Sequence, residues 1–434
     1  MADWQPAFVY CGIVIVSINS LLAWNIFITA NGYFRYKLSL TPHGVAPAND
    51  SSAAYLEETF ESWFSILGGV ANLAAAAANV VLTKHVSNFK RSVWAHVATA
   101  VPLVVCAALA VTDTSAWTQL FFLVSLACVV LGTIPSCGVL IGTVGGLASQ
   151  LPEVYIQAFM VGGSVAGVVA SLAEIVTQAY WPEPQWNGFA YFVFGVLYGV
   201  VSLSAYVGVV RTTFVKSYID APKYSRLAVS SSSESVDADA AAHEDEVALV
   251  EPPSPQRPQL SILIVLTKIK YEIAALVLNY VLTAALYPPL TSLVRSTSTN
   301  ATWRAYFTPV ACFLLYNFSD LMGRVACFWC RWPGASSGGL LLACVCARAL
   351  LTPLLFVCNV EGATVVLFAQ DWQFALLVAL FGATNGYLLS VSGMHAPAKV
   401  EQRETEMVGS IVSCGIAVGI MAGSLLSYAV VALV

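Results

Sequence analysis

The stretch from Ala7 to Phe34 reads AFVYCGIVIVSINSLLAWNIFITANGYF, 28 residues without one charged side chain. A helix rises about 1.5 Å per residue, so about 20 apolar residues cross the hydrocarbon core of a bilayer, which is about 30 Å thick. The run is too long for the apolar core of a cleavable signal peptide. We therefore interpret it as a retained membrane-spanning helix.

The composition of the whole chain agrees with this interpretation. Of the 434 residues, 58% are hydrophobic and only 10% are charged, whereas about 25% are charged in an ordinary soluble domain. So few charges cannot cover the surface of a water-soluble protein of this size, so most of that surface must face lipid. The formal net charge of -5 also excludes a nucleic-acid binder, which needs a basic excess.

The same length rule predicts the fold class, an all-α polytopic membrane protein with eleven transmembrane helices. The predicted spans are 8–33, 60–83, 92–112, 117–148, 153–178, 188–211, 260–287, 303–327, 337–358, 372–396 and 407–432.

The basic residues of the loops predict the orientation, because cytoplasmic loops carry an excess of Lys and Arg. With a cytoplasmic N-terminus, 11 basic residues fall in inner loops and only 4 in outer loops, and Val434 lies outside. The four outer ones are Arg35, Lys37, Arg295 and Arg304. Two glycosylation sequons, at Asn49 and Asn300, both fall in outer loops, which agrees with this topology.

A long polar segment separates the sixth and seventh predicted spans. Residues 212–259 contain a serine run, an acidic stretch from Asp237 to Glu251 and the sequence PPSPQRPQ. Such a composition cannot bury enough apolar surface to order itself, so we expect a disordered cytoplasmic linker. It would divide the chain into a six-helix bundle, 1–211, and a five-helix bundle, 260–434. Two bundles joined in this way suit a transporter that alternates access, whereas a receptor or scaffold signalling through the linker is the alternative.

The most informative intramembrane residues lie in YNFSDLMGR, residues 316–324. A charge at the bilayer centre costs roughly 2.5–3.5 kcal/mol on insertion scales, so Asp320 and Arg324 should face a cavity or the bundle interior. At about 100° per residue, Phe313, Asn317, Asp320 and Arg324 form one stripe of an aromatic ring, an amide, an acceptor and a donor fork. This stripe could hold a polyhydroxylated solute with a ring. A structural ion pair that locks the two bundles together is an equal alternative.

Other polar residues in the spans leave more than one interpretation open. Trp24 fits either an interfacial anchor or a substrate contact, and Asn25 either a substrate contact or a hydrogen bond between helices. Glu174 and Glu272 lie near span ends, where we expect water to reach them, although a proton-carrying role stays open. Arg348 is a second buried cation whose partner the sequence does not identify.

Several local patterns predict structure rather than chemistry. Tyr287 precedes two prolines, which predicts a break at the outer end of the seventh span. Glycines at spacing four predict close helix packing: Gly142 and Gly146, Gly163 and Gly167, and Gly415, Gly419 and Gly423. The 11 cysteines fall in apolar stretches and are interpreted as small apolar filler. No nucleophile–base pair or set of metal ligands appears in the spans, so we expect neither enzymatic activity nor a cofactor.

Four strings, in order along the chain, resemble the equilibrative nucleoside transporter family, in particular its protozoan-type members. They are LLAWNIFITANGYF, GTVGGLASQLP, NFSDLMGR and NGYLLSVSGMHAPAKV, the last of which leads into the glycine-rich final span. The resemblance implies a major-facilitator-like architecture with one span fewer and facilitative movement of nucleosides, sometimes nucleobases, across the plasma membrane. Some protozoan-type members specialise in purine salvage or couple transport to protons, so proton-coupled symport is the alternative.

The resemblance also implies roles for individual residues. Asp320 and Arg324 correspond to the family's ribose-contacting acid and base, and Asn317 to the amide near them. The Trp–Asn pair that lines the cavity corresponds to Trp24 and Asn25. Further matches to positions lining the central cavity or its outer gate are Leu21, Ile28, Phe313, Tyr287 and Ile420.

Three departures from the family pattern bear on substrate range. Ala23 replaces a proline before the Trp–Asn pair, which puts a kink there in doubt. Ile141 replaces a glutamine beside the nucleobase, and the string Gly162–Gly167 loses another glutamine. We therefore expect a shifted substrate range, toward purine bases or a narrow set of nucleosides.

Overall fold

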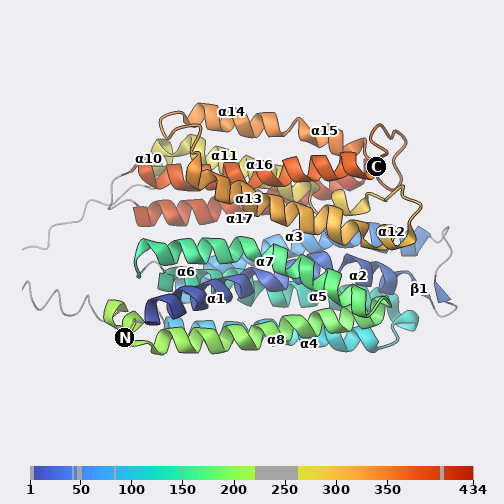
Figure 1. Cartoon of the computed structure of the whole chain (residues 1–434), viewed down its shortest axis with the longest axis horizontal. Coiled ribbons are helices and arrows are strands. Elements are labelled where there is room, and N and C mark those ends of the chain that lie inside the picture. Colours follow the sequence, from blue (N-terminus) through green and yellow to red (C-terminus); the bar gives the residue numbers. More distant parts are fainter. Residues whose placement is uncertain are drawn as a thin grey trace, which may run out of the picture.

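The computed structural model describes residues 4–41, 44–45, 51–82, 85–148, 150–219, 262–400 and 405–433. Within these ranges the chain is helical, apart from connecting turns and a hairpin of β1 (Leu40–Thr41) and β2 (Gly44–Val45). The helices form two halves that lie side by side with roughly parallel axes, the N-terminal half below and the C-terminal half above in Figure 1.

The N-terminal half consists of α1 (Gln5–Thr29), α2 (Asn31–Leu38), α3 (Ser51–Leu82), α4 (Asn88–Val111), α5 (Thr118–Thr133), α6 (Ile141–Ala148), α7 (Glu153–Tyr180) and α8 (Pro184–Arg211). The C-terminal half consists of α10 (Ile262–Lys268), α11 (Lys270–Leu286), α12 (Ala301–Phe307), α13 (Leu315–Trp329), α14 (Gly338–Arg348), α15 (Leu351–Phe356), α16 (Asp371–Ala398) and α17 (Thr405–Val431). Short 3-10 turns span Ser115–Trp117 and Thr291–Leu293.

In the part of the chain that the structure describes, ten helical stretches are long and apolar enough to cross a membrane. The predicted spans 372–396 and 407–432 differ from α16 and α17 by no more than two residues at either end. The helix α3, with 32 residues, is not among the ten and begins nine residues before its predicted start at 60. The hydropathy rule placed that start late because Glu57 and Glu58 end the apolar run. The protein is thus an all-helical, multi-pass membrane protein.

Two of the long stretches contain a π-helical segment. Ile134–Leu140 joins α5 to α6, and Thr308–Leu314 joins α12 to α13. Each segment carries a proline at its start, Pro135 or Pro309, and proline removes a backbone donor from the helical ladder. The wider π turn keeps both stretches continuous and changes the register of the side chains that follow.

The predicted break after the seventh span is confirmed. The helix α11 ends at Leu286, and Tyr287 to Leu290 form a turn that contains Pro288 and Pro289. Of the predicted linker, only residues 212–219 are described, and residues 213–219 are helical. The remainder of the linker lies outside the described residues.

The glycines at spacing four differ in how closely a neighbouring helix approaches them. Added methyl groups at Gly419 and Gly423 would lie 2.8 and 2.6 Å from backbone oxygens of α11, so the packing prediction for α17 is confirmed. By contrast, a methyl group at Gly146 would meet nothing within 4 Å, so no close helix contact requires glycine there.

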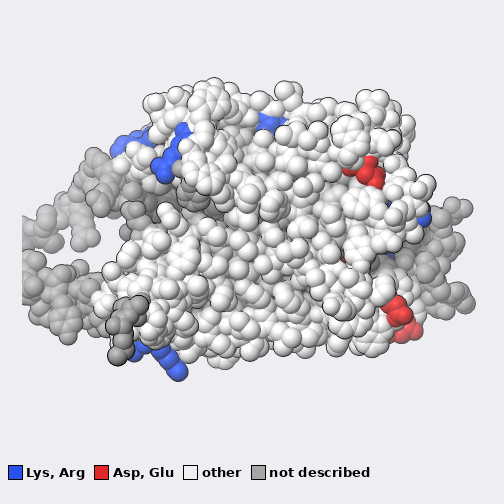
Figure 2. All heavy atoms as spheres, in the orientation of Figure 1, with Lys and Arg blue, Asp and Glu red and all other residues white. Residues whose placement is uncertain are grey.

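We call the two ends of the molecule the α10 end, where the chain begins, and the α12 end. On the face drawn in Figure 2, Lys and Arg lie mostly at the α10 end and Asp and Glu at the α12 end. A broad band between them is almost free of charge, as lipid contact requires.

The two halves touch through α3 against α17 and through α7 against α13 and its π segment. At the α12 end, Gln178 of α7 donates to the Ala305 carbonyl of α12 at 3.0 Å, and Arg35 of α2 pairs with Glu361 of the C-terminal half at 2.8 Å. Hydrogen bonds and an ion pair therefore join the halves at this end.

Candidate functional site

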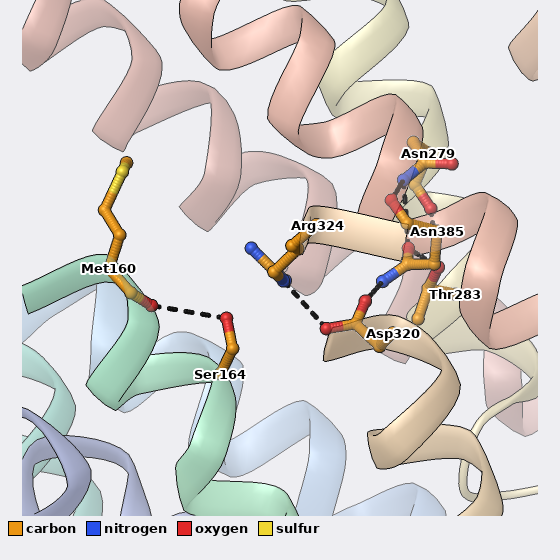
Figure 3. A network of polar contacts seen from close by, with 7 residues as sticks. All are labelled: Met160, Ser164, Asn279, Thr283, Asp320, Arg324 and Asn385. Carbon is orange, nitrogen blue, oxygen red and sulfur yellow. Dashed lines mark hydrogen bonds and ion pairs between the residues drawn. The ribbon is translucent and has the colours of Figure 1, made fainter. Parts of the chain in front are cut away.

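Asp320 and Arg324 lie on one face of α13 and form an ion pair. Arg324 donates from Nε to Asp320 Oδ2 at 2.8 Å, as the spacing of four residues predicted. The Asp320 side chain is 11% exposed and that of Arg324 is 33% exposed, so the pair is not sealed inside the protein. Arg324 reaches away from α13 toward the side of α7 that carries Met160 and Ser164 (Figure 3).

The second carboxylate oxygen of Asp320 has a partner from another helix. Asn385 of α16 donates from Nδ2 to Asp320 Oδ1 at 2.6 Å. The two helices come this close because α16 carries glycine where they meet. A methyl group at Gly386 would lie 1.9 Å from the Asp320 carbonyl oxygen. Asn385 was not predicted, although it stands in the quoted string NGYLL, because periodicity does not show which polar residue meets which.

Arg348, whose partner the sequence did not identify, joins the same network. It donates to Asn279 Oδ1 at 3.1 Å and to Thr283 Oγ1 at 3.0 Å, both on α11. Asn279 in turn donates to Asn385 Oδ1 at 2.9 Å. The guanidinium also lies 3.9 Å from the centre of the Phe381 ring. Figure 3 shows Asn385 next to Asp320, with Asn279 on the far side of Asn385.

Asn317 lies where the two halves meet. It donates to the Tyr287 hydroxyl at 3.2 Å and to the Phe313 carbonyl, one turn earlier, at 2.9 Å. It also faces α7, where a methyl group at Gly167 would lie 2.0 Å from Asn317 Oδ1. Tyr287 is buried and stacks on Tyr316 with ring centres 3.7 Å apart.

Of the four residues in the predicted stripe on α13, Phe313 is the most deeply buried. Asn317, Asp320 and Arg324 share a face, but Phe313 is only 1% exposed and packs edge-on against Tyr287. Phe313 belongs to the π-helical segment, where the spacing of 100° per residue does not hold. Phe313 is thus covered in this structure, and its role as a cavity-lining residue stays a prediction.

Two of the predicted residues of α1, Trp24 and Leu21, lie toward α3 and α7 respectively. Trp24 packs on Phe64 of α3 with ring centres 4.8 Å apart. Asn25 donates to the Leu21 carbonyl of its own helix at 2.9 Å, so this bond is neither of the two predicted alternatives. The helix runs unbroken through Ala23, in line with the doubt about a kink there. Leu21 faces Gly163 of α7.

The other predicted residues lie apart from the ion pair. Ile28 lines a small cavity of about 10 Å³ near the α12 end. Phe34 and Phe64 of the same half and Pro288 of the C-terminal half also line it. Ile420 of α17 faces Gly69 of α3, between the halves. Ile141 is half-buried at the start of α6, directly after the π segment.

Asn300 caps the start of α12 by accepting a bond from the Trp303 backbone amide at 3.2 Å. Asn49 lies outside the described residues.

The expectation that water reaches Glu174 and Glu272 is wrong. Glu174 is 4% exposed and Glu272 is 1% exposed, because neighbouring helices cover both. Glu174 accepts from Asn187 of α8 at 2.9 Å, and Glu272 pairs with Lys399 at 2.6 Å. The hydropathy profile could not show this cover, since it reads one helix at a time.

Comparisons with known proteins agree with the fold and the sequence motifs. Residues 126–432 match the family described as "Nucleoside transporter". The chain is 29% identical to equilibrative nucleoside transporter 2 of Rattus norvegicus over 438 residues, which cover 95% of this chain and 94% of that protein. It is 28% identical to equilibrative nucleoside transporter 1 of Homo sapiens, with the same two coverages.

Among solved structures, the nucleoside transporter NupG superposes with a TM-score of 0.53 at 10% identity, covering 98% of this chain and 92% of that one. An auto-inhibited peptide transporter of the POT family gives a TM-score of 0.51 at 12% identity, covering 99% and 89%. At such low identity these two show a shared fold alone. The family match spans well over half of the chain, and on that ground the chain belongs to the nucleoside transporter family.

Proposed function

We propose that the protein carries nucleosides across a membrane down their concentration gradient, by alternating access between its two halves. The observation that carries the proposal is the ion pair of Asp320 and Arg324, which is partly exposed in the middle of a span and faces the other half. The family match and its relatives named as nucleoside transporters support the choice of substrate class.

The proposed topology has eleven spans in bundles of six and five, with α3 as the additional span. The N-terminus is cytoplasmic, the C-terminus is extracellular and the membrane is the plasma membrane. The basic residues at the α10 end support this orientation, because positive charge accumulates on the cytoplasmic side. The α12 end is then extracellular and Asn300, which is exposed there, becomes the candidate glycosylation site.

In the proposed complex, the ribose hydroxyls donate to the carboxylate of Asp320 and accept from the guanidinium of Arg324. Each carboxylate oxygen has two lone pairs. Each can therefore accept a hydrogen bond from a ribose hydroxyl and still keep its bond to Arg324 or Asn385. Hydrogen bonds to charged groups are about twice as strong as neutral ones. The base lies toward Trp24 and Leu21 on α1, and closing one end while opening the other exchanges access.

The test is uptake of a radiolabelled nucleoside and of its 2′,3′-dideoxy analogue by liposomes that contain the purified protein. Both Asp320→Ala and Asp320→Asn should lose most nucleoside uptake, about tenfold or more, because a charged acceptor of two hydroxyl groups is removed. The dideoxy analogue, which cannot use that acceptor, should be affected much less. The matched control is Asp113→Asn, which removes an exposed carboxylate in the loop after α4 and should transport normally.

Normal nucleoside uptake by a folded Asp320→Asn protein would refute the site. Competition by purine and pyrimidine nucleosides and nucleobases in the same liposomes then measures the substrate range. The loss of two family glutamines leads us to propose a purine-preferring range that includes some nucleobases, as purine salvage requires.

A second candidate is proton-coupled symport of a nucleoside or nucleobase, and one observation favours it. Glu174 is buried within α7, and its Oε2 makes no hydrogen bond among the described residues. A buried carboxylate of this kind is a functional candidate by default in a membrane protein. Uphill accumulation driven by an imposed pH gradient, and its loss in Glu174→Gln, would establish coupling. Accumulation that never exceeds the external concentration would establish facilitation.

A further inference from the structure

Arg348 is a buried cation without a carboxylate beside it. Its residue is 3% exposed, and none of the ion pairs among the described residues includes it. Its hydrogen bonds go to neutral oxygens of Asn279, Thr283, Phe381 and Thr384. Burying a charge in this way is costly, so a cation here calls for a reason beyond packing.

The network around Arg348 has a fixed direction. A guanidinium can only donate hydrogen bonds and an ionised carboxylate can only accept them. Between these two ends, Asn279 accepts from Arg348 at 3.1 Å and donates to Asn385 at 2.9 Å. Asn385 then donates to Asp320 Oδ1 at 2.6 Å. With an obligate donor at one end and an obligate acceptor at the other, neither amide can turn round without losing two bonds.

In this chain of bonds the two carboxylate oxygens of Asp320 have different partners. Oδ1 receives the neutral donor Asn385, while Oδ2 receives Arg324 on the side that faces α7. The network draws on four helices, since Arg348 comes from α14, Asn279 from α11, Asn385 from α16 and Asp320 from α13. Polarised chains of hydrogen bonds strengthen one another in a medium of low dielectric constant.

We propose that Arg348 is a positioning residue for substrate binding. Acting through Asn279 and Asn385, it fixes the rotamer of Asp320 so that the carboxylate edge beside Arg324 meets the ribose hydroxyls. The proposal rests on the proposed function, because it assumes that Asp320 contacts the sugar. Arg348 itself does not touch the substrate.

The experiment measures a ratio that does not depend on how much protein folds, namely initial uptake of a nucleoside divided by that of its 2′,3′-dideoxy analogue. Asn385→Asp hardly changes the side-chain volume but sets a second carboxyl group against Asp320 Oδ1. Two carboxyl groups this close share one proton, so Asp320 no longer presents a full negative charge to the ribose hydroxyls. We expect the ratio to fall about tenfold, as loss of one well-placed charged hydrogen bond predicts. Arg348→Gln should also lower the ratio. Arg348→Lys keeps the charge on one donor nitrogen with three N–H groups, so its ratio should lie between that of Arg348→Gln and that of the unmodified protein.

The matched control is Asn187→Asp in the N-terminal half. Asn187 is buried and donates to a buried carboxylate, that of Glu174, at the comparable distance of 2.9 Å. This variant therefore imposes the same chemical change away from Asp320, and its ratio should remain that of the unmodified protein. An equal fall in both Asn→Asp variants would overturn the proposal, because any buried carboxylate would then produce the effect.

The Asp320→Asn variant distinguishes failure of the positioning role of Arg348 from failure of the proposed function of Asp320. If the ratio collapses in Asp320→Asn but stays unchanged in Asn385→Asp and Arg348→Gln, the ribose assignment holds and the positioning role is refuted. If the ratio stays unchanged in Asp320→Asn as well, the proposed function of Asp320 is itself refuted. Should Arg348→Gln not fold, Asn385→Asp and Arg348→Lys still decide between these outcomes.

Discussion

The position of Trp24, a predicted substrate contact, depends on a glycine, Gly68, that leaves room for its ring. The indole lies against Phe64 and directly over Gly68, where an added methyl carbon would be 2.3 Å from Trp24 Cζ3. The sequence marked Trp24 as informative but gave no sign that Gly68, more than forty residues later, shapes its surroundings.

Gly68→Ala should therefore displace Trp24 and weaken binding of the base. Overpacking costs about 1–3 kcal/mol, which exceeds the gain of up to about 1 kcal/mol that alanine brings to a helix. We expect a lower melting temperature in detergent and a KM for nucleoside raised severalfold. Gly146→Ala is the control, since its methyl group meets nothing within 4 Å. If both variants behave alike, Trp24 does not depend on Gly68.

At the level of helices, the approach of α13 to α16 brings Asn385 within bonding distance of Asp320. Two glycines of α16 allow this approach. Methyl groups at Gly382 and Gly386 would lie 2.6 and 1.9 Å from backbone oxygens of α13. The helices themselves were predicted within a few residues, but their separation depends on which faces meet.

Gly386→Ala should push the two helices apart and break the bond between Asn385 and Asp320. The added methyl group would meet the backbone oxygen of Asp320, which cannot move away as a flexible side chain can. We therefore expect nucleoside uptake to fall about tenfold and the melting temperature to fall as well. Gly393→Ala, two turns further along α16, meets nothing within 4 Å and should be neutral or slightly stabilising. Normal uptake by Gly386→Ala would mean that the close approach does not serve the site.

For the molecule as a whole, one carboxylate connects the two halves at the α12 end. Glu361 accepts from Arg295 of its own half at 2.7 Å and from Arg35 of the other half at 2.8 Å. Burial raises the pKa of the Glu361 carboxyl, but Arg295 and Arg35 outweigh burial and hold that pKa below its ordinary value. The stabilisation that the Glu361 carboxylate gives to this contact is thus fully present above its ordinary pKa of about 4.3. It is lost as the pH falls through the lowered pKa of the folded protein.

Glu361→Gln should loosen the α12 end at neutral pH. We expect faster hydrogen–deuterium exchange in α2, which carries Arg35, and a smaller effect of salt on that exchange than in the unmodified protein. In the unmodified protein the protection that this contact gives to α2, taken as exchange corrected for the intrinsic pH dependence of amide exchange, should not change between about pH 6 and 8, because Glu361 stays ionised there.

Asp371→Asn is the control for this prediction. Asp371 lies at the same end but bonds within its own half, to Thr297 and Trp303. Its substitution should change exchange near α12 and leave α2 unaffected. Equal acceleration of α2 in both variants would show that the bridge to Arg35 does not join the halves.

The sequence by itself determined the membrane-spanning class, most helix bounds and the pairing of Asp320 with Arg324. Each of these depends on residues close together along the chain, through hydropathy over about 20 residues or the spacing of one helical turn. Only the tertiary structure decided that Arg348 bonds Asn279, that Asn385 meets Asp320, that Phe313 turns inward at a π segment and that Glu174 and Glu272 are buried. Those contacts join helices far apart in the chain, and hydropathy does not record which face of one helix touches which face of another.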